Sequence, residues 1–373
     1  MSVLQAERDP GTRDEPSRMA TVTVDLRAIV SNWRSARAAF QGPALGAVVK
    51  HDAYGLGLIP VAETLWRAGC TLFWVAWLEE ALRLSKALPD AAIYTLNGLA
   101  GHDPKVFAAN RIVPVLSSWC DVEAAAGAGV EGLPVAVMAD GGLMRLGLTD
   151  GELHRLAGDA GLRARLDVGL WLTQLAHFAR PDAPENAAQV ARLRAAIEPA
   201  GPSARLSVVS SSGVFHAPAF HFDTGRVGSA LYGVQTSLPA RQPVTPAFEI
   251  SAPVLRVVEV PAGASIGYGG DVATQRPSRL ATLAIGYGCG LPRTVPGHAH
   301  VAFDGMKAPY IGRLSMGLSA VDVTDLPAGA VSEGTRAEIV GPSVPLETLA
   351  DDAGTIGNDV LIRLARGLPR VYR

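Results

Sequence analysis

The sequence predicts an α/β protein: an N-terminal (β/α)8 barrel of the TIM type, followed by a C-terminal all-β domain. From about residue 25 to 240, short apolar runs alternate with helical patterns, which is typical of parallel strands buried on both faces. Eight such units fall within about 220 residues, as in a closed barrel rather than an open sheet. After residue 240, short strands separated by Gly and Pro turns indicate a domain of β structure.

The apolar runs and the helical patterns between them set the order of the expected elements. The eight barrel strands are expected at 46–50, 71–77, 91–96, 111–116, 133–139, 165–172, 205–210 and 229–234. Helical patterns between them include 58–69, 103–110, 121–129, 150–161 and 186–197. The β domain is expected to contain short strands and no long helical stretches.

The chain of 373 residues is long enough to bury two ordinary cores. The polar stretch at 1–18 reads as a disordered tail, followed by a barrel domain at 19–245 and a β domain at 246–373. The segment ARQPVTP at 240–246 is a plausible linker between the two domains.

Composition excludes several classes of partner. Lys and Arg number 33 against 35 Asp and Glu, and no dense basic run suits nucleic acid or an anionic membrane. The N-terminus has no apolar segment typical of a signal peptide, and no run approaches the ~18 residues of a membrane span, so we expect a cytoplasmic protein. The cysteines Cys70, Cys120 and Cys289 lie in no metal-ligand spacing, so we expect small core residues and no metal.

Polar residues follow several of the expected strands, where the active sites of such barrels lie. They are Lys50, residues 140–145, residues 210–213, Arg226 and Gly228. A lysine at the end of a buried strand has a partly desolvated amine, and a Ser/Gly loop offers hydroxyls and N–H groups to a phosphate. Taken alone, the lysine is most simply a solvated surface residue, and the Ser/Gly stretch is most simply an ordinary loop. Their combination on one rim suggests pyridoxal phosphate.

The stretch AVVKHDAYGLG, residues 47–57, resembles the cofactor-lysine motif of the alanine racemase family. The resemblance extends from about residue 20 to the C-terminus. It implies that Lys50 holds pyridoxal phosphate as a Schiff base and that Tyr54 lies near the phosphate.

Three further barrel stretches resemble the family's motifs in order and spacing. MRLGL implies that Arg145 contacts the cofactor's ring oxygen and the substrate carboxylate, and SSSG implies that Ser211 binds the phosphate. GRVGSALYG implies that Arg226 faces the pyridine nitrogen, while the backbone of Gly228 and Ser229 meets the phosphate.

The β domain carries the remaining motifs. SIGYGG resembles the segment whose tyrosine, here Tyr268, is the second catalytic base and comes from the partner subunit. AIGYGCGLPR and GRLSM imply that Tyr287 contacts the substrate and that the backbone of Met316 lies by its carboxylate. The resemblance thus implies a head-to-tail homodimer with composite sites that supplies D-alanine for peptidoglycan.

The residue types suit racemisation, which removes an α-proton from one face and returns one to the other. Two acid/base groups must therefore flank the cofactor, and the resemblance assigns Lys50 and Tyr268. An always-charged arginine at the pyridine nitrogen keeps that nitrogen unprotonated and so discourages transamination.

Four positions depart from the family's pattern. Gln174 replaces a histidine that supports the pyridine-facing arginine, Met138 replaces a lysine that orients Arg145, and Gly317 replaces an aspartate. Asn358 replaces a tyrosine that reaches the phosphate and closes over the substrate side chain, so it is a shorter cofactor contact. Space beyond an alanine methyl is therefore expected, and a racemase of serine or another small to medium amino acid is the alternative.

Two other functions are known for proteins with a related barrel. A pyridoxal-phosphate-binding protein with little catalysis usually consists of the barrel alone, so the expected β domain with Tyr268 argues against it. A decarboxylase of similar architecture typically sets a carboxylate against the pyridine nitrogen, which Arg226 disfavours.

Overall fold

The computed structural model describes residues 19–180, 182–236, 241–295 and 297–373, and it contains two compact units. The barrel unit consists of Thr23–Phe248, Thr355–Arg366 and Arg370–Arg373. The β unit consists of residues 19–22, Glu249–Gly354 and Gly367–Pro369. The expected tail at 1–18 lies outside the described residues. The chain leaves the barrel unit after Phe248 and returns to it at Thr355.

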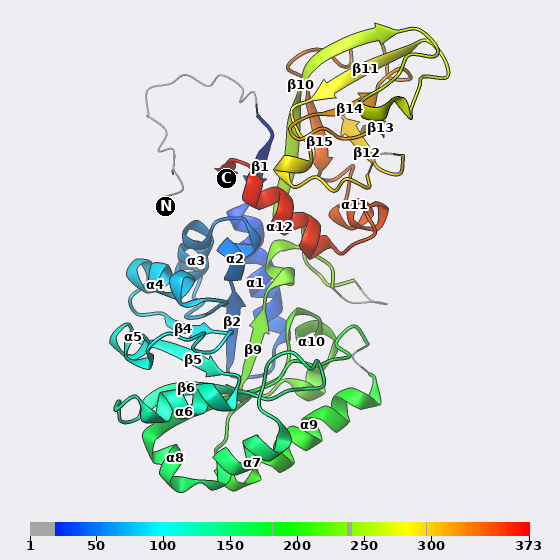
Figure 1. Ribbon diagram of the computed structural model, residues 1–373. Coiled ribbons are helices and arrows are strands. Elements are labelled where there is room, and N and C mark those ends of the chain that lie inside the picture. Colours follow the sequence, from blue (N-terminus) through cyan, green and yellow to red (C-terminus); the bar gives the residue numbers. More distant parts are fainter. Residues whose placement is uncertain (1–18, 181, 237–240, 296) are drawn as a thin grey trace. The chain divides into compact units, whose positions relative to one another are not determined.

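Eight parallel strands form the sheet of the barrel unit (Figure 1). They are β2 (Ala44–Val48), β3 (Leu72–Val75), β4 (Ala92–Thr95), β5 (Ile112–Leu116), β6 (Leu133–Met138), β7 (Leu166–Leu172), β8 (Leu206–Ser207) and β9 (Thr224–Val227). The order is β8-β7-β6-β5-β4-β3-β2-β9. Backbone hydrogen bonds from Asp223 N to Leu206 O (3.0 Å) and from Arg226 N to Val209 O (3.1 Å) join the two ends. The predicted (β/α)8 barrel is confirmed.

Helices follow most of the strands and lie outside them in Figure 1. They are α1 (Leu26–Ala39), α3 (Leu58–Arg67), α4 (Leu78–Ala87), α5 (Pro104–Ala109), α6 (Trp119–Gly127), α7 (Asp150–Gly158), α8 (Ala160–Arg165), α9 (Pro184–Ile197) and α10 (Ser211–His216). Side-chain oxygens of Asp25, Asp103, Ser118, Thr149 and Asp159 accept backbone N–H groups at the helix starts. The pattern of short capped helices therefore agrees with the expected segments.

The eighth strand lies elsewhere than the sequence predicted. We expected it at 229–234, but Ser229–Tyr232 is a 3-10 helix and the strand is β9. The sequence of β9, TGRV, is too polar to read as a buried strand, although all four residues are buried. The charged Arg226 is accommodated because its guanidinium donates to acceptors inside the barrel.

The β unit is a closed antiparallel sheet. Its strands are β10 (Phe248–Val260), β11 (Ser278–Leu283), β12 (His300–Phe303), β13 (Met306–Ile311), β14 (Ser319–Asp322) and β15 (Arg336–Val340). These six strands follow one another in the order β11-β14-β13-β12-β15-β10 within their sheet, and β10 also pairs with β11. The 13-residue β10 is long enough to pair with β15 through its first half and with β11 through its second.

Two helices near the C-terminus depart from the expected pattern of β structure. They are α11 (Leu346–Asp352), which lies in the β unit, and α12 (Gly357–Gly367), which lies almost entirely in the barrel unit. α12 buries Val360, Leu361, Leu364 and Ala365 along one face. This spacing is the helical period that the sequence analysis overlooked after residue 345.

The cysteines differ in burial, and all three are free thiols. Cys70 is buried and Cys289 partly buried, but Cys120 is exposed near the start of α6. The expectation of three core cysteines is therefore wrong for Cys120, because it lies on the solvent side of its helix.

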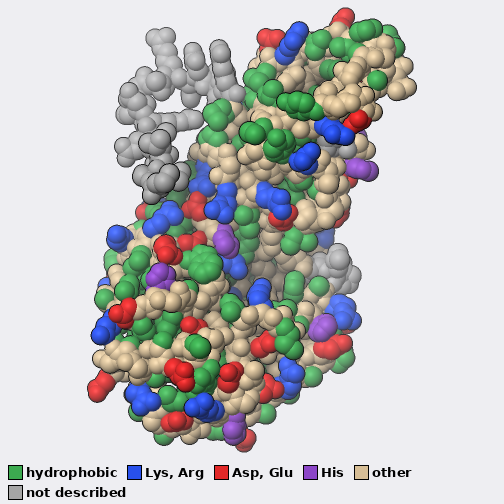
Figure 2. Space-filling model, in the orientation of Figure 1, with side chains coloured by type: hydrophobic (Ala, Val, Ile, Leu, Met, Phe, Trp, Pro, Cys, Tyr) green, Lys and Arg blue, Asp and Glu red, His purple; other side chains and the backbone are tan. Residues whose placement is uncertain are grey.

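The described surface has mixed charge. On the face drawn in Figure 2, acidic and basic side chains are interspersed over the described residues. Within the described ranges, no helix is long and apolar enough to cross a membrane.

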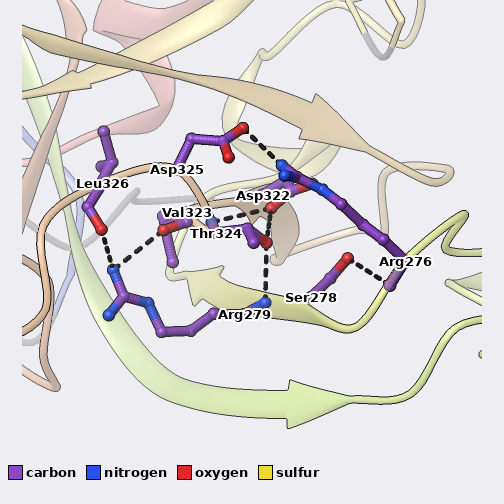
Figure 3. Close-up of polar contacts among 8 residues, drawn as sticks. All are labelled: Arg276, Ser278, Arg279, Asp322, Val323, Thr324, Asp325 and Leu326. Atoms are coloured by element: carbon purple, nitrogen blue, oxygen red, sulfur yellow. Dashed lines mark hydrogen bonds and ion pairs between the residues drawn. The ribbon is translucent and has the colours of Figure 1, made fainter.

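Arg279 fastens the segment after β14 to β11 (Figure 3). Its backbone N–H donates to Thr324 Oγ1 at 2.9 Å, and Asp322 accepts the N–H of Thr324 at the same distance. Its guanidinium donates to three backbone oxygens, those of Val323 (3.0 Å), Leu326 (2.9 Å) and Pro327 (3.2 Å). The neighbouring Arg276 instead forms an exposed ion pair with Asp325.

We expect Arg279→Ala to lower the free energy of unfolding of the β unit by about 1.5–3 kcal/mol, because three carbonyls lose a charged donor. Arg276→Ala is the control, with little expected change because its ion pair is exposed. All six tryptophans lie in the barrel unit, so urea unfolding must be followed by far-UV circular dichroism together with hydrogen exchange at 322–327. Equal effects of the two substitutions would contradict this account.

Candidate functional site

A cavity of about 460 Å³ lies in the barrel unit, at the carboxyl ends of the strands. Eight residues that the sequence analysis assigned to the site line it: Lys50, Tyr54, Arg145, Ser211, Arg226, Gly228, Ser229 and Asn358. Gln174 and Met138, two of the positions that depart from the family pattern, also line it. Residues far apart in the sequence therefore meet at one place in the barrel.

Lys50 begins a left-handed turn, α2 (Lys50–Tyr54), directly after β2. Residues 51–54 all have φ between 54° and 58°, a conformation that costs each L-residue about 1–2 kcal/mol. Backbone bonds close the turn from Ala53 N to Val49 O (2.8 Å) and from Gly55 N to His51 O (2.9 Å). The turn brings the first and last side chains of the segment to the same cavity.

The Asp52 carboxylate ties this turn to neighbouring segments. Its Oδ1 accepts the N–H of Leu58 at 2.9 Å, and its Oδ2 lies 2.8 Å from Arg370 Nη1. Arg83 lies 3.7 Å from the same carboxylate. These contacts explain why an aspartate follows the lysine so closely, since they offset part of the cost of the left-handed backbone.

The environment of Lys50 favours its neutral amine. Burial is the largest cause that lowers the pKa of Lys50, and the positive charges of Arg145 and Arg226 lower it further. The carboxylate of Glu80 acts in the opposite direction and raises this pKa. A lysine with a lowered pKa has more of the neutral amine, which acts as a nucleophile or a base.

Arg226 is buried and is held by neutral acceptors. Its Nη1 donates to Ser207 O (3.0 Å) and to the Ser207 hydroxyl, and its Nη2 donates to Thr173 O at 2.6 Å. Gln174 Oε1 lies 3.4 Å from Nη2, at the edge of hydrogen-bond distance. Burial lowers the pKa of Arg226 to about 10. In the described ranges no carboxylate forms an ion pair with it, so it adds uncompensated positive charge beneath the cavity.

A group of small polar residues forms one wall of the cavity. Ser211 Oγ accepts the N–H groups of Gly228 (3.0 Å) and Ala230 (3.3 Å). Asn358 Nδ2 donates to Ser229 Oγ at 2.9 Å, while its buried Oδ1 has no hydrogen-bond partner among the described residues. We call Ser211, Gly228, Ser229 and Asn358 the polar cradle.

Tyr54 packs against the polar cradle. Its ring lies 4.7 Å from that of Tyr232, and burial raises the pKa of Tyr54 to about 12, while a hydrogen bond with Ser229 acts in the opposite direction. A Cβ on Gly228 would lie 2.5 Å from the Tyr54 hydroxyl and 3.2 Å from Val48 Cβ. The tyrosine therefore reaches the cradle only because residue 228 has no side chain.

Arg145 lies on the loop after β6, and its side chain is exposed at the cavity rim. Asp140 Oδ1 shapes this loop by accepting the N–H groups of Gly142 (3.0 Å) and Met144 (3.2 Å). Among the described residues, no ion pair or hydrogen bond holds the Arg145 guanidinium. The apolar Met138 lines the cavity nearby and offers it no charge.

The other three assigned residues lie in the β unit. Tyr268 is 70% exposed at a turn where Gly267 and Gly269 have positive φ. Tyr287 and Met316 are exposed, and the residue after Tyr287 donates its N–H to Met316 O at 2.7 Å. Tyr287 and Met316 are thus neighbours in the β unit.

The sequence analysis missed several residues at the site. Asn97 lines the cavity, and it could have been found because it directly follows the expected strand at 91–96. Ser207 and Thr173 hold Arg226, but they read as ordinary strand residues. Glu80 lies in α4, for which the sequence analysis named no segment, and no sequence signal linked it to Lys50.

Two family models match the chain. The model described as "Alanine racemase, N-terminal domain" matches residues 24–236, and "Alanine racemase, C-terminal domain" matches residues 247–372. Together they cover both compact units.

Curated relatives and solved structures agree with these matches. An alanine racemase of Methylobacterium is 37% identical over 356 residues, covering 95% of this chain and 97% of its own. A catabolic alanine racemase of Rhizobium johnstonii is 40% identical over 357 residues, covering 94% of each. The Bartonella henselae alanine racemase with covalently bound pyridoxal phosphate superposes with a TM-score of 0.89 at 34% identity, covering 95% of this chain and 99% of its own.

We expect Gly228→Ala to lower the free energy of unfolding of the barrel unit by about 1–3 kcal/mol, because its Cβ overlaps the Tyr54 hydroxyl. Adding Tyr54→Phe should recover much of the loss, since it removes the overlapping atom. Gly158→Ala, at the end of α7 with open space around its Cβ, is the control and should leave stability unchanged or raise it. Tryptophan fluorescence in urea reports these changes. Failure of the double variant to recover would contradict the steric account.

Proposed function

The chain belongs to the alanine racemase family, and from that premise we propose that it is a pyridoxal-phosphate-dependent racemase that interconverts L-alanine and D-alanine. One observation carries the proposal. A lysine with a lowered pKa, a buried arginine held by neutral acceptors, and the polar cradle share one cavity. The Bartonella henselae relative carries its pyridoxal phosphate covalently, which suits an amine in this position.

The residues of the cavity fit pyridoxal phosphate. A volume of about 460 Å³ lies within the range of roughly 300–1,000 Å³ for small-ligand sites. Lys50 supplies an amine for the aldehyde, and the polar cradle supplies N–H and hydroxyl groups for the phosphate. The buried Oδ1 of Asn358 has no hydrogen-bond partner among the described residues, so this wall of the cavity keeps an acceptor for a hydrogen-bond donor of a bound group.

Pyridoxal phosphate, when bound, withdraws the electrons left behind when the α-proton of an amino acid is removed. Two side chains of the protein are proposed to move that proton. The neutral amine of Lys50 serves one face, and the hydroxyl of Tyr268 serves the other. Because the two groups act from opposite faces, a proton removed from one side is returned to the other, which inverts the α-carbon.

Arg226 and Arg145 are proposed to orient the reactants. Arg226 donates hydrogen bonds but accepts no proton, so a ring nitrogen facing it stays unprotonated, which disfavours transamination. Arg145 has no internal carboxylate partner among the described residues, so its guanidinium is available to the ring oxygen and the substrate carboxylate. Tyr287 and the backbone of Met316 are proposed to contact the substrate.

A homodimer with composite sites is part of the proposal. Apolar side chains are exposed on the β unit at Tyr268, Met316 and Leu318, and on the barrel rim at Leu143 and Met144. A second copy of the chain would cover such surfaces. The cytoplasmic location stays a prediction. The supply of D-alanine for peptidoglycan also stays one, because the chain resembles relatives named biosynthetic and relatives named catabolic.

The protein loaded with pyridoxal phosphate should convert L-alanine to D-alanine in deuterated water and place deuterium at the α-carbon. We expect Lys50→Ala to abolish inversion, and Tyr268→Phe to abolish inversion while α-proton exchange persists for one enantiomer, because one base remains. NMR measures exchange, and chiral chromatography measures inversion. A cofactor-bound protein without exchange would instead be a binding protein with little catalysis.

Mixing the two variants tests the shared site. A mixed dimer with composite sites contains one doubly altered site and one intact site. Co-refolded Lys50→Ala and Tyr268→Phe chains should then recover about a quarter of wild-type activity, since half of the random dimers are mixed. Each variant refolded alone is the control. If both groups came from the same chain, the mixture would stay inactive.

Asn358 favours a second candidate function, racemisation of serine or a slightly larger amino acid. Its side chain is short, lines the cavity, and has an oxygen without a partner that suits a substrate hydroxyl. This alternative retains the cofactor and both bases and changes only the preferred side chain.

We expect Asn358→Tyr to lower kcat/KM for serine relative to alanine by roughly tenfold or more, because the larger ring fills the space beyond the methyl group. Arg363→Gln, which alters an exposed ion pair on the same helix α12, is the matched control. Both substrates are assayed with each variant under the same conditions. An unchanged ratio would show that residue 358 does not select the substrate.

A further inference from the structure

Glu80, the third residue of α4, accepts three backbone N–H groups with one carboxylate. Its Oε1 accepts the N–H of Asp52 at 3.0 Å. Its Oε2 accepts those of Ala76 (2.9 Å) and Trp77 (3.3 Å), which lie between β3 and α4. The left-handed turn after β2 is thus fastened to the neighbouring strand connection through a single side chain.

This contact supplies an acceptor that the turn itself lacks. Within the turn, the N–H groups of Ala53 and Gly55 have backbone acceptors, whereas that of Asp52 donates to Glu80. The side chain of Asp52 is occupied elsewhere, by Leu58 N and Arg370. The strained backbone between Lys50 and Tyr54 therefore depends on Glu80 on the side facing β3.

Glu80 is also the acidic group that acts on the Lys50 amine. Arg145 and Arg226 line the cavity with Lys50, and their positive charges disfavour the ammonium form of this lysine. The carboxylate of Asp140 also lines the cavity. The carboxylate of Glu80 favours the ammonium form of Lys50. The adjacent Glu79 differs, because it is 70% exposed and its carboxylate lies 3.6 Å from His102 Nε2.

We propose that Glu80 is a positioning residue of this site: its carboxylate fixes the left-handed turn that aims Lys50 and Tyr54 into the cavity, and it holds a negative charge against the backbone two residues after Lys50. The inference rests on the proposed function for its chemical meaning. The hydrogen bonds of Glu80 to Asp52, Ala76 and Trp77 are formed by the chain alone, so they can be tested without substrate.

Glu80→Gln, Glu80→Asp and the control Glu79→Gln distinguish this role from general stabilisation. The first readout is hydrogen exchange at residues 50–57 of the full-length protein, measured with and without pyridoxal phosphate. The second is the pH dependence of the rate at which pyridoxal phosphate reacts with the protein, followed by visible absorbance. Borohydride reduction and peptide mapping identify Lys50 as the reacting lysine.

In Glu80→Gln, an amide N–H2 meets a backbone donor, so exchange in the turn should rise roughly tenfold or more. The midpoint of the pH profile should move to lower pH, because the charge that favours the Lys50 ammonium is gone. Glu80→Asp keeps the negative charge, but its side chain is one methylene shorter and no longer reaches the N–H of Asp52. Its midpoint should stay near that of the wild type while exchange rises, and Glu79→Gln should change neither.

Two results would overturn the proposal. One is an exchange pattern in Glu80→Gln equal to that in Glu79→Gln. The other is a lowered thermal stability with an unmoved midpoint, which would make Glu80 merely structural. If Glu80→Gln does not fold, Glu80→Asp still decides through its exchange pattern. Failure of wild-type Lys50 to take up pyridoxal phosphate would overturn the proposed function instead. Hydrogen exchange would still show whether Glu80 holds the left-handed turn.

Discussion

The guanidinium of Arg226 is buried with neutral partners, and the arrangement of the last three barrel strands depends on the hydrogen bonds that it donates. Its acceptors come from Thr173, which follows β7, and from Ser207 in β8, while Arg226 itself lies in β9. The strands where the barrel closes are thus joined through one side chain. Removing it would leave buried acceptors without donors, which costs more than the bonds contribute when made.

The charge of Arg226 also sets the electrostatics of the cavity. With Arg145 it supplies positive charge to the site, and both arginines lower the pKa of the Lys50 amine. Such positive charge beside a polar cradle attracts an anionic cofactor, while a lowered lysine pKa supplies the neutral amine that such a cofactor needs. The left-handed turn directs this amine, and its backbone strain is offset by contacts of Asp52 and Glu80.

Much of the fold could be predicted because parallel barrel strands are buried on both faces and therefore read as apolar runs. Seven of the eight expected strands overlap observed ones. β9 was missed because Gly225 and Arg226 break its apolar pattern, and their burial depends on acceptors more than 15 positions away. α12 was missed because its amphipathic period follows strands of another unit, to which it does not belong.

The sequence by itself determined the barrel, the all-β character of most of the second unit, and the residues at strand ends such as Lys50 and Ser211, because strand direction places those ends on one rim. Only the tertiary structure decided how these residues are held. The neutral acceptors of Arg226, the left-handed turn, and the contact of Glu80 with Asp52 join segments that are distant in the chain. Local patterns carry no information about such pairs, since each partner alone is compatible with an ordinary strand, loop or helix.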